Sequence, residues 1–170
     1  MPKPVTVSIE VPQAIEHVYD FLDVMGNHEP FTDHLLRDWE LSGPARGVGA
    51  KARVHVRALG VSDVVDIEVV DAEAPTRIVE RNVAAKAGRT AEGTYTLHRL
   101  PSGGTRIEFE YRWIVTPLAD RLTAPLARAF IRCANETAMR RLADQLSTPS
   151  SVSMRRRIAT DDAYVESMPK

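Results

Sequence analysis

The order of its parts is the feature that most limits how this chain can fold. A strand-like segment at residues 5–11 precedes a short helical stretch, several valine-rich segments follow, and one long amphipathic stretch ends near Leu146. Strands followed by a large helix are typical of α+β folds, in which the helix lies across one face of an antiparallel sheet. We therefore expect a curved sheet, a long helix across it, and an enclosed space between them.

Composition excludes several classes of protein. The 170 residues, 44% of them hydrophobic, suffice for one domain with a sizeable core but not for two. The 22 basic and 23 acidic residues are spread along the chain, so no nucleic-acid partner is expected. No apolar run approaches the roughly 20 residues that span a bilayer, and no secretory signal is visible. We expect a soluble, cytoplasmic protein.

The first third of the chain predicts one strand, two short helices and a second strand. Valine and isoleucine alternate with polar residues over 5–11, which indicates a strand with one buried face. Pro12 can open a helix, and apolar residues at helical spacing continue to Leu22, before Gly26 and Asn27 end it. A second helical turn is expected at 29–34 and a strand at 35–41, with Trp39 on its inner face.

Five further strands are expected between Ala50 and Thr116, separated by turns near 59–62, 74–75, 86–89 and 101–104. The first of these turns would pair charged residues on one side of the sheet and apolar residues on the other. The expected pairs are His55 with Asp66, Arg53 with Glu68, and Val54 and Val56 with Ile67 and Val65. The last of these strands, at 105–116, should place Phe109, Tyr111 and Trp113 on its inner face.

The last helix and a tail complete the predicted organisation. A helical segment should begin at Leu118, kink at Pro125, which lacks an N–H group, and run to about Leu146. Residues 1–147 would then form one ligand-binding domain. Residues 148–170, with the run Arg155–Arg157, lack a sustained apolar pattern and are expected to be flexible or weakly docked.

The order of elements, the turn LPSGGTR at 100–106 and the strand that ends at Thr116-Pro117 before the long helix carry a resemblance. Over residues 3 to 147 the chain resembles the START-like, birch-pollen-allergen (SRPBCC) superfamily, and most of all its polyketide cyclase/dehydrase and lipid-transport branch. The resemblance implies a helix-grip fold, in which a seven-stranded curved antiparallel sheet wraps a long C-terminal helix. It also implies a cavity for an apolar ligand, without identifying that ligand.

The expected strand pairings place three polar side chains on the inner face. Arg81 would lie beside Ile67 and Tyr95, Tyr95 beside Phe109, and Tyr111 two residues further along. A buried guanidinium needs a partner, and the pattern indicates no carboxylate on the inward faces of these strands. We therefore hypothesise a ligand with an apolar body and an acidic or carbonyl head that meets Arg81.

An alternative register remains open, because a slip of one residue would turn Arg81 outward and bring Glu80 and Asn82 in. In the favoured register the expected cavity is lined from both the sheet and the long helix. Its residues are Trp39, Val54, Val56, Ile67, Arg81, Tyr95, Phe109, Tyr111, Trp113, Leu122, Leu126, Phe130, Cys133 and Thr137. Cys133, the lone cysteine, is interpreted as a small buried hydrophobe.

The five histidines form no metal signature, so no metal or cofactor is expected. His28 and His34 stand six residues apart in a turn-rich segment, which fits no helical ligand pair, and both are interpreted as surface residues.

Three functions remain open. The favoured one is binding of a lipid-like or polyketide-like molecule without turnover. The second is a polyketide cyclase, aromatase or dehydratase in which Arg81 polarises a carbonyl and Tyr95 or Tyr111 exchanges a proton. The third is a non-catalytic module for a protein partner. Whether the chain forms a homodimer is also left open.

Overall fold

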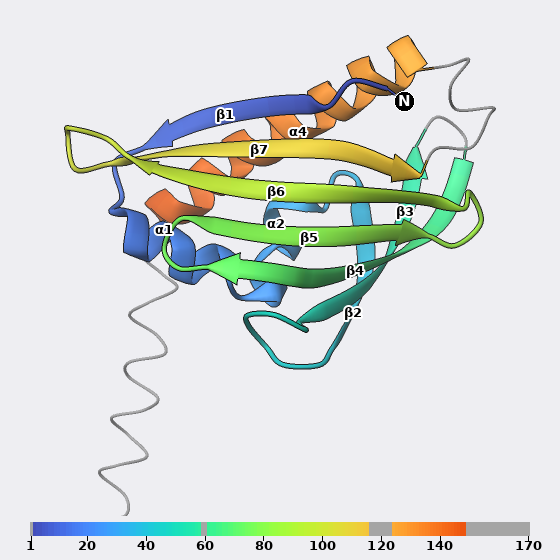
Figure 1. Ribbon diagram of the computed structural model, residues 1–170, viewed down its shortest axis with the longest axis horizontal. Coiled ribbons are helices and arrows are strands. Elements are labelled where there is room, and N and C mark those ends of the chain that lie inside the picture. The colour runs from blue at the N-terminus through green and yellow to red at the C-terminus, as the bar shows by residue number, and fades with distance from the viewer. Residues whose placement is uncertain (1, 59–60, 116–123, 149–170) are drawn as a thin grey trace, which may run out of the picture.

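One curved antiparallel sheet organises the part of the chain that the structure describes (Figure 1). The structure is a computed structural model and describes residues 2–58, 61–115 and 124–148. The sheet has the predicted seven strands, and in this part of the chain they lie in the order β1-β7-β6-β5-β4-β3-β2. They are β1 (Val5–Val11), β2 (Leu36–Ser42), β3 (Lys51–Ala58), β4 (Val61–Glu73), β5 (Arg77–Ala84), β6 (Arg89–Arg99) and β7 (Thr105–Val115).

The helices lie on one side of this sheet. Two short ones, α1 (Ile15–Leu22) and α2 (Glu29–Thr32), stand between β1 and β2, with a 3₁₀ turn, η1 (Met25–Asn27), between them. The long helix α4 (Ala124–Ser147) packs against β1 and α2, and Figure 1 shows it crossing the sheet. The predicted helix-grip architecture is therefore confirmed. None of the described helices combines the length and the hydropathy that crossing a bilayer requires.

Strand β1, which forms one edge of the sheet, has one buried face and one exposed face. In β1 the side chains of Val5, Val7 and Val11 are buried, whereas the polar residues between them face outward. Because β1 pairs with β7 rather than with β2, the strand that opens the chain joins the strand that comes last. This pairing leaves β2 as the opposite edge and lets the sheet curve around α4.

The predicted register between β3 and β4 is wrong by two residues. Arg53 lies opposite Asp66, to which it donates hydrogen bonds, and His55 lies opposite Val64. The strands pair as far as Ala58 and Val61, which lie closer together in sequence than the expected pairing allows. A shift by two keeps every side chain on its predicted face, so Val54 remains inside.

The predicted register of β5 is wrong by one residue against β4 and by three residues against β6. Both are odd shifts, so the two faces of β5 are exchanged. Glu80 is buried and Asn82 half-buried on the inner side, whereas Arg81 is exposed on the outer side between Glu68 and Glu92 of the neighbouring strands. A bulge in β4 between Val69 and Asp71 interrupts the regular pairing. The prediction that Arg81 faces the cavity is therefore wrong.

The fully buried residues of helix α4 all lie at or after Ala134. Ala134, Ala138, Met139, Leu142 and Leu146 are buried, but Leu126 near its start is 64% exposed. Pro125 is the second residue of the helix, where its missing N–H costs no hydrogen bond. The helical segment predicted at 118–123 and the predicted tail at 149–170 lie outside the described residues.

Candidate functional site

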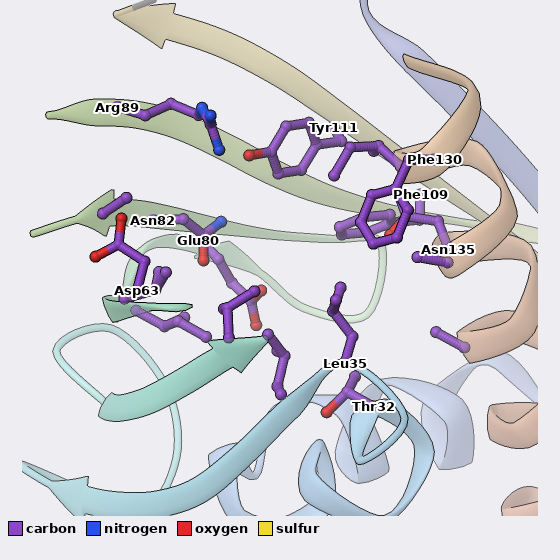
Figure 2. Close-up of a pocket in the computed structure, with 18 of the residues that line it drawn as sticks. Thr32, Leu35, Asp63, Glu80, Asn82, Arg89, Phe109, Tyr111, Phe130 and Asn135 are labelled. Carbon is purple, nitrogen blue, oxygen red and sulfur yellow. The ribbon is translucent and has the colours of Figure 1, made fainter. Parts of the chain in front are cut away.

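A cavity of about 440 Å³ lies between the inner face of the sheet and helices α2 and α4. Figure 2 shows its lining, with Glu80 and Asn82 on the sheet side, Thr32 and Leu35 below them, and Phe130 and Asn135 on α4. Ligand pockets in proteins hold roughly 300–1,000 Å³, so this space has the size that a small molecule needs.

Aromatic side chains form much of the cavity wall. The rings of Tyr95 and Phe109 lie 4.6 Å apart, and those of Tyr111 and Trp113 meet edge to face at 5.0 Å. Gly93 makes room for this packing, because a Cβ atom at its position would lie 2.9 Å from the Phe109 ring. The inner rows of β6 and β7 thus give the cavity an apolar wall.

A histidine and a carboxylate are buried together in this apolar setting. The Nδ1 atom of His28 lies 3.1 Å from Oε1 of Glu80, and the two side chains are 4% and 7% exposed. The other ring nitrogen of His28, Nε2, lies 2.7 Å from the carbonyl oxygen of Leu22 at the end of α1. Because a carbonyl oxygen can only accept, Nε2 carries a proton and donates it.

The surroundings favour a proton on the second nitrogen of His28 as well. Burial alone lowers the pKa of His28, but the Glu80 carboxylate and the hydrogen bond to the Leu22 carbonyl outweigh it, so the net pKa is raised. Tyr95 lies beside this pair, with its ring centre 5.8 Å from that of His28. Its burial and the charge of Glu80 raise the pKa of Tyr95 well above its ordinary value, so its hydroxyl stays neutral.

Three residues that line the cavity each have one buried polar atom with no hydrogen-bond partner among the described residues. The atoms are Oε1 of Glu80, whose approach to His28 has the distance but not the direction of a hydrogen bond, Nδ1 of His34 and Nδ2 of Asn135. The Nε2 atom of His34 lies 3.0 Å from the carbonyl oxygen of Ala134 on α4 and therefore donates to it. These side chains belong to the polar part of an otherwise largely apolar lining.

Two other charged residues line the cavity in different roles. Asp63 accepts backbone N–H bonds from Val64, Lys86 and Ala87 at 2.7 to 3.0 Å. Burial raises the pKa of Asp63, but these three bonds outweigh it and lower the net value, so this carboxylate is charged and already satisfied. Arg89 extends toward Tyr111 in Figure 2.

Most of the residues predicted from sequence to line the cavity do so. Trp39, Val56, Ile67, Tyr95, Phe109, Tyr111, Trp113, Leu126 and Phe130 border it. Four predicted positions do not, since Val54 is buried in the core, Arg81 is on the outer face, Cys133 is exposed and Thr137 is half-buried elsewhere on α4. Leu122 lies outside the described residues.

Sequence reasoning missed the polar residues of the site. His28, interpreted as a surface residue, is 3% exposed, and His34 borders the cavity. The expectation of no inward carboxylate is contradicted by Glu80. One signal was present, because the alternative register of β5 places Glu80 and Asn82 inside. No three His, Cys, Asp or Glu side chains in the described ranges gather closely enough to hold a metal ion.

Comparison with known families agrees with this geometry. The sequence profile of the family described as polyketide cyclase / dehydrase and lipid transport matches residues 3–147. The chain belongs to this family. The match covers β1 through β7 and α4, and with them every described residue that lines the cavity except Pro2. No curated protein matches the sequence significantly.

Solved structures share the fold at low sequence identity. TTHA0849 from Thermus thermophilus is 18% identical with a TM-score of 0.67, over 88% of this chain and 100% of that one. Ara h 8.0201 is 12% identical with a TM-score of 0.62, over 86% and 98%. DynU16, from the dynemicin biosynthetic locus, is 22% identical with a TM-score of 0.59, and 85% of this chain matches only 47% of it.

Proposed function

We propose that this protein binds a small, largely apolar molecule, lipid-like or polyketide-like, in the cavity between the sheet and α4. The observation that carries the proposal is the cavity itself, which has the volume of a ligand pocket and predominantly apolar walls. The match to a family described in terms of polyketide chemistry and lipid transport supports the same class of ligand. With Arg81 on the outer face, the proposal no longer includes an acidic head group held by that residue.

Two measurements test the proposal. Native mass spectrometry of the purified protein, set against its denatured mass, would reveal a molecule retained during purification. Titration with N-phenyl-1-naphthylamine, a neutral dye whose fluorescence rises in apolar surroundings, would measure binding directly. We expect saturable binding of one dye molecule per chain, and a bare protein that fails to bind the dye would refute the proposal.

A pair of matched variants on α4 locates the binding. Ala134→Leu adds a side chain at a buried position on the cavity wall, whereas Ala129→Leu makes the same change at an exposed position of the same helix. The first variant should weaken dye binding at least tenfold because it occupies part of the space, and the second should leave it unchanged. Equal effects would place the bound dye somewhere other than the cavity.

A second candidate is a cyclase or dehydratase activity on a ligand in the same cavity. The buried pair of Glu80 and His28 is the observation that favours it, because it supplies a proton acceptor beside an apolar space. In a dehydration, Glu80 would take a proton from the carbon next to a carbonyl. A hydroxyl on the following carbon would leave as water with that proton, and a carbon–carbon double bond would form.

A model substrate tests the second candidate. Conversion of 3-hydroxy-1-phenylbutan-1-one to its conjugated enone can be followed by ultraviolet absorbance. Activity that is lost in Glu80→Gln and kept in Arg81→Gln would support the dehydratase. Dye binding in the cavity without enone formation would favour the binding protein instead.

A further inference from the structure

Two side chains that line the cavity from different walls each carry a buried hydrogen-bond acceptor. Glu80 reaches it from β5, where its Oε1 atom is paired in charge with Nδ1 of His28 at 3.1 Å but meets it without hydrogen-bond direction. A carboxylate has lone pairs for more than one donor, so Glu80 keeps the capacity to accept from a ligand. His34 reaches the cavity from the segment between α2 and β2, and its Nδ1 atom has no hydrogen-bond partner among the described residues. Buried acceptors of this kind are stabilised by a donor, which a bound ligand can supply.

The tautomer of His34 follows from its other contact. Its Nε2 atom lies 3.0 Å from the Ala134 carbonyl oxygen, so in the neutral ring the proton sits on Nε2. The Nδ1 atom of that ring therefore has a lone pair and accepts a hydrogen bond. Together with the carboxylate of Glu80, the cavity presents two acceptors to its contents.

The charges around the cavity argue against an acidic ligand near Glu80. The proton that His28 holds is balanced by Glu80, so the pair as a whole is close to neutral. Asp63 adds a second negative charge to the lining. Figure 2 shows Arg89 directed toward Tyr111, away from Glu80. A carboxylate placed against Glu80 would meet a like charge in apolar surroundings, which is unfavourable.

We propose that the polar end of the ligand is a neutral hydroxyl group, phenolic or alcoholic, that donates a hydrogen bond to Glu80. This inference rests on the proposed function, since it specifies which apolar molecules the cavity takes. In this inference the head group of the ligand is a hydrogen-bond donor and not an acid. One hydroxyl donates to the Glu80 carboxylate, and a second hydroxyl on the same molecule would donate to Nδ1 of His34. The amide nitrogen of Asn135 on α4, also unpartnered among the described residues, suits a ligand carbonyl oxygen.

Three naphthalenes of similar size but different polar groups test this proposal. 2-Naphthol donates a hydrogen bond, 2-methoxynaphthalene only accepts one, and 2-naphthoic acid is an anion at neutral pH. Their affinities can be measured by displacement of N-phenyl-1-naphthylamine and by calorimetry. We expect 2-naphthol to bind about tenfold or more tightly than the ether, as a hydrogen bond to a charged acceptor provides, and the acid to bind weakest.

Two variants of neighbouring residues assign the preference to Glu80. Glu80→Gln replaces the carboxylate with an amide that can donate to the ether oxygen, so the preference for 2-naphthol should fall to threefold or less. Arg81→Gln changes the next residue of the same strand, on the outer face, and should leave all three affinities unchanged. If Glu80→Gln does not fold, the ranking of the three compounds on the wild-type protein decides the question.

The outcomes separate this inference from the proposed function. If no naphthalene and no dye binds, the proposed function itself fails. If all three bind with equal affinity, the cavity takes apolar molecules but the inferred hydroxyl preference is wrong. If the acid binds most tightly, the ligand is anionic and the assignment to a hydroxyl donor is overturned.

Discussion

At the scale of single residues, Glu80 and His28 bring charge into an otherwise apolar region. Each would be costly to bury alone, and each lowers the cost of the other. The pair also joins two parts of the chain, because Glu80 lies on β5 and His28 follows η1. His28 further satisfies the free Leu22 carbonyl at the C-terminal end of α1, where a positive charge is favoured.

The raised pKa of His28 predicts how stability changes with pH. The folded protein holds this proton more tightly than the unfolded chain, whose histidines titrate near 6.5. The contribution to stability is therefore complete below about pH 6.5 and is lost as the pH rises through the raised folded pKa. Urea unfolding measured from about one unit below pH 6.5 to about two units above it should show this decline.

Removal of the Glu80 charge should reverse the sign of this pH dependence. In Glu80→Gln, burial acts on His28 without a carboxylate to oppose it, so its folded pKa should fall below that of the unfolded chain. The variant should then lose stability as the pH drops below about 6.5, where the unfolded histidine takes up a proton. Parallel stability curves for the two proteins would show that Glu80 does not control the His28 proton.

The sequence could predict the apolar part of the site but not this pair. Aromatic residues at every second position of β7 have one consistent inner face, and the structure keeps it. In β5 the two faces read Ile-Glu-Asn-Ala and Arg-Val-Arg-Val, so hydrophobicity does not choose between them. The choice depends on His28, which is distant in sequence and contacts Glu80 only in the folded chain.

At the scale of elements, regular spacing was predictable and local irregularities were not. The bounds of β1 agree with the alternation of its residues, and β5, β6 and β7 agree within one residue at most of their ends. The bulges in β2 and β4 have no clear sign in the sequence, yet they determine which residues lie opposite each other. The point at which β3 and β4 stop pairing was likewise not visible in the sequence, and their predicted register is wrong by two residues.

The Asp63 carboxylate joins β4 to the turn between β5 and β6 by hydrogen bonds, and we expect these bonds to contribute measurably to stability. Its carboxylate accepts N–H bonds from Lys86 and Ala87 in that turn and from Val64. Asp63→Ala leaves these donors without their acceptor and should lower the free energy of unfolding by about 1–3 kcal/mol. Asp63→Asn keeps one carbonyl oxygen and should cost less. Chemical denaturation of both variants measures the difference, and equal losses would contradict this interpretation.

At the scale of the whole molecule, the cavity makes stability depend on its contents. A ligand that binds only the folded state stabilises it by about 2.7 kcal/mol when its free concentration is 100 times its dissociation constant. Saturating N-phenyl-1-naphthylamine should therefore raise the melting temperature of the wild-type protein. The rise should be much smaller for Ala134→Leu at the same dye concentration, while Ala129→Leu should respond as the wild type does. A dye-induced shift of equal size in all three would argue against binding in the cavity.

The pairing of β1 with β7 and its packing against α4 also governs when the binding space can exist during synthesis. During synthesis β1 leaves the ribosome first, but its two neighbours, β7 and α4, follow only after the other strands. Until α4 has been made, the aromatic face of β6 and β7 lacks the helix that covers it in the finished protein. The protein can therefore bind a ligand only after the whole domain has been synthesised and folded. A chain halted before α4 would expose the apolar face of its sheet, a surface that chaperones bind.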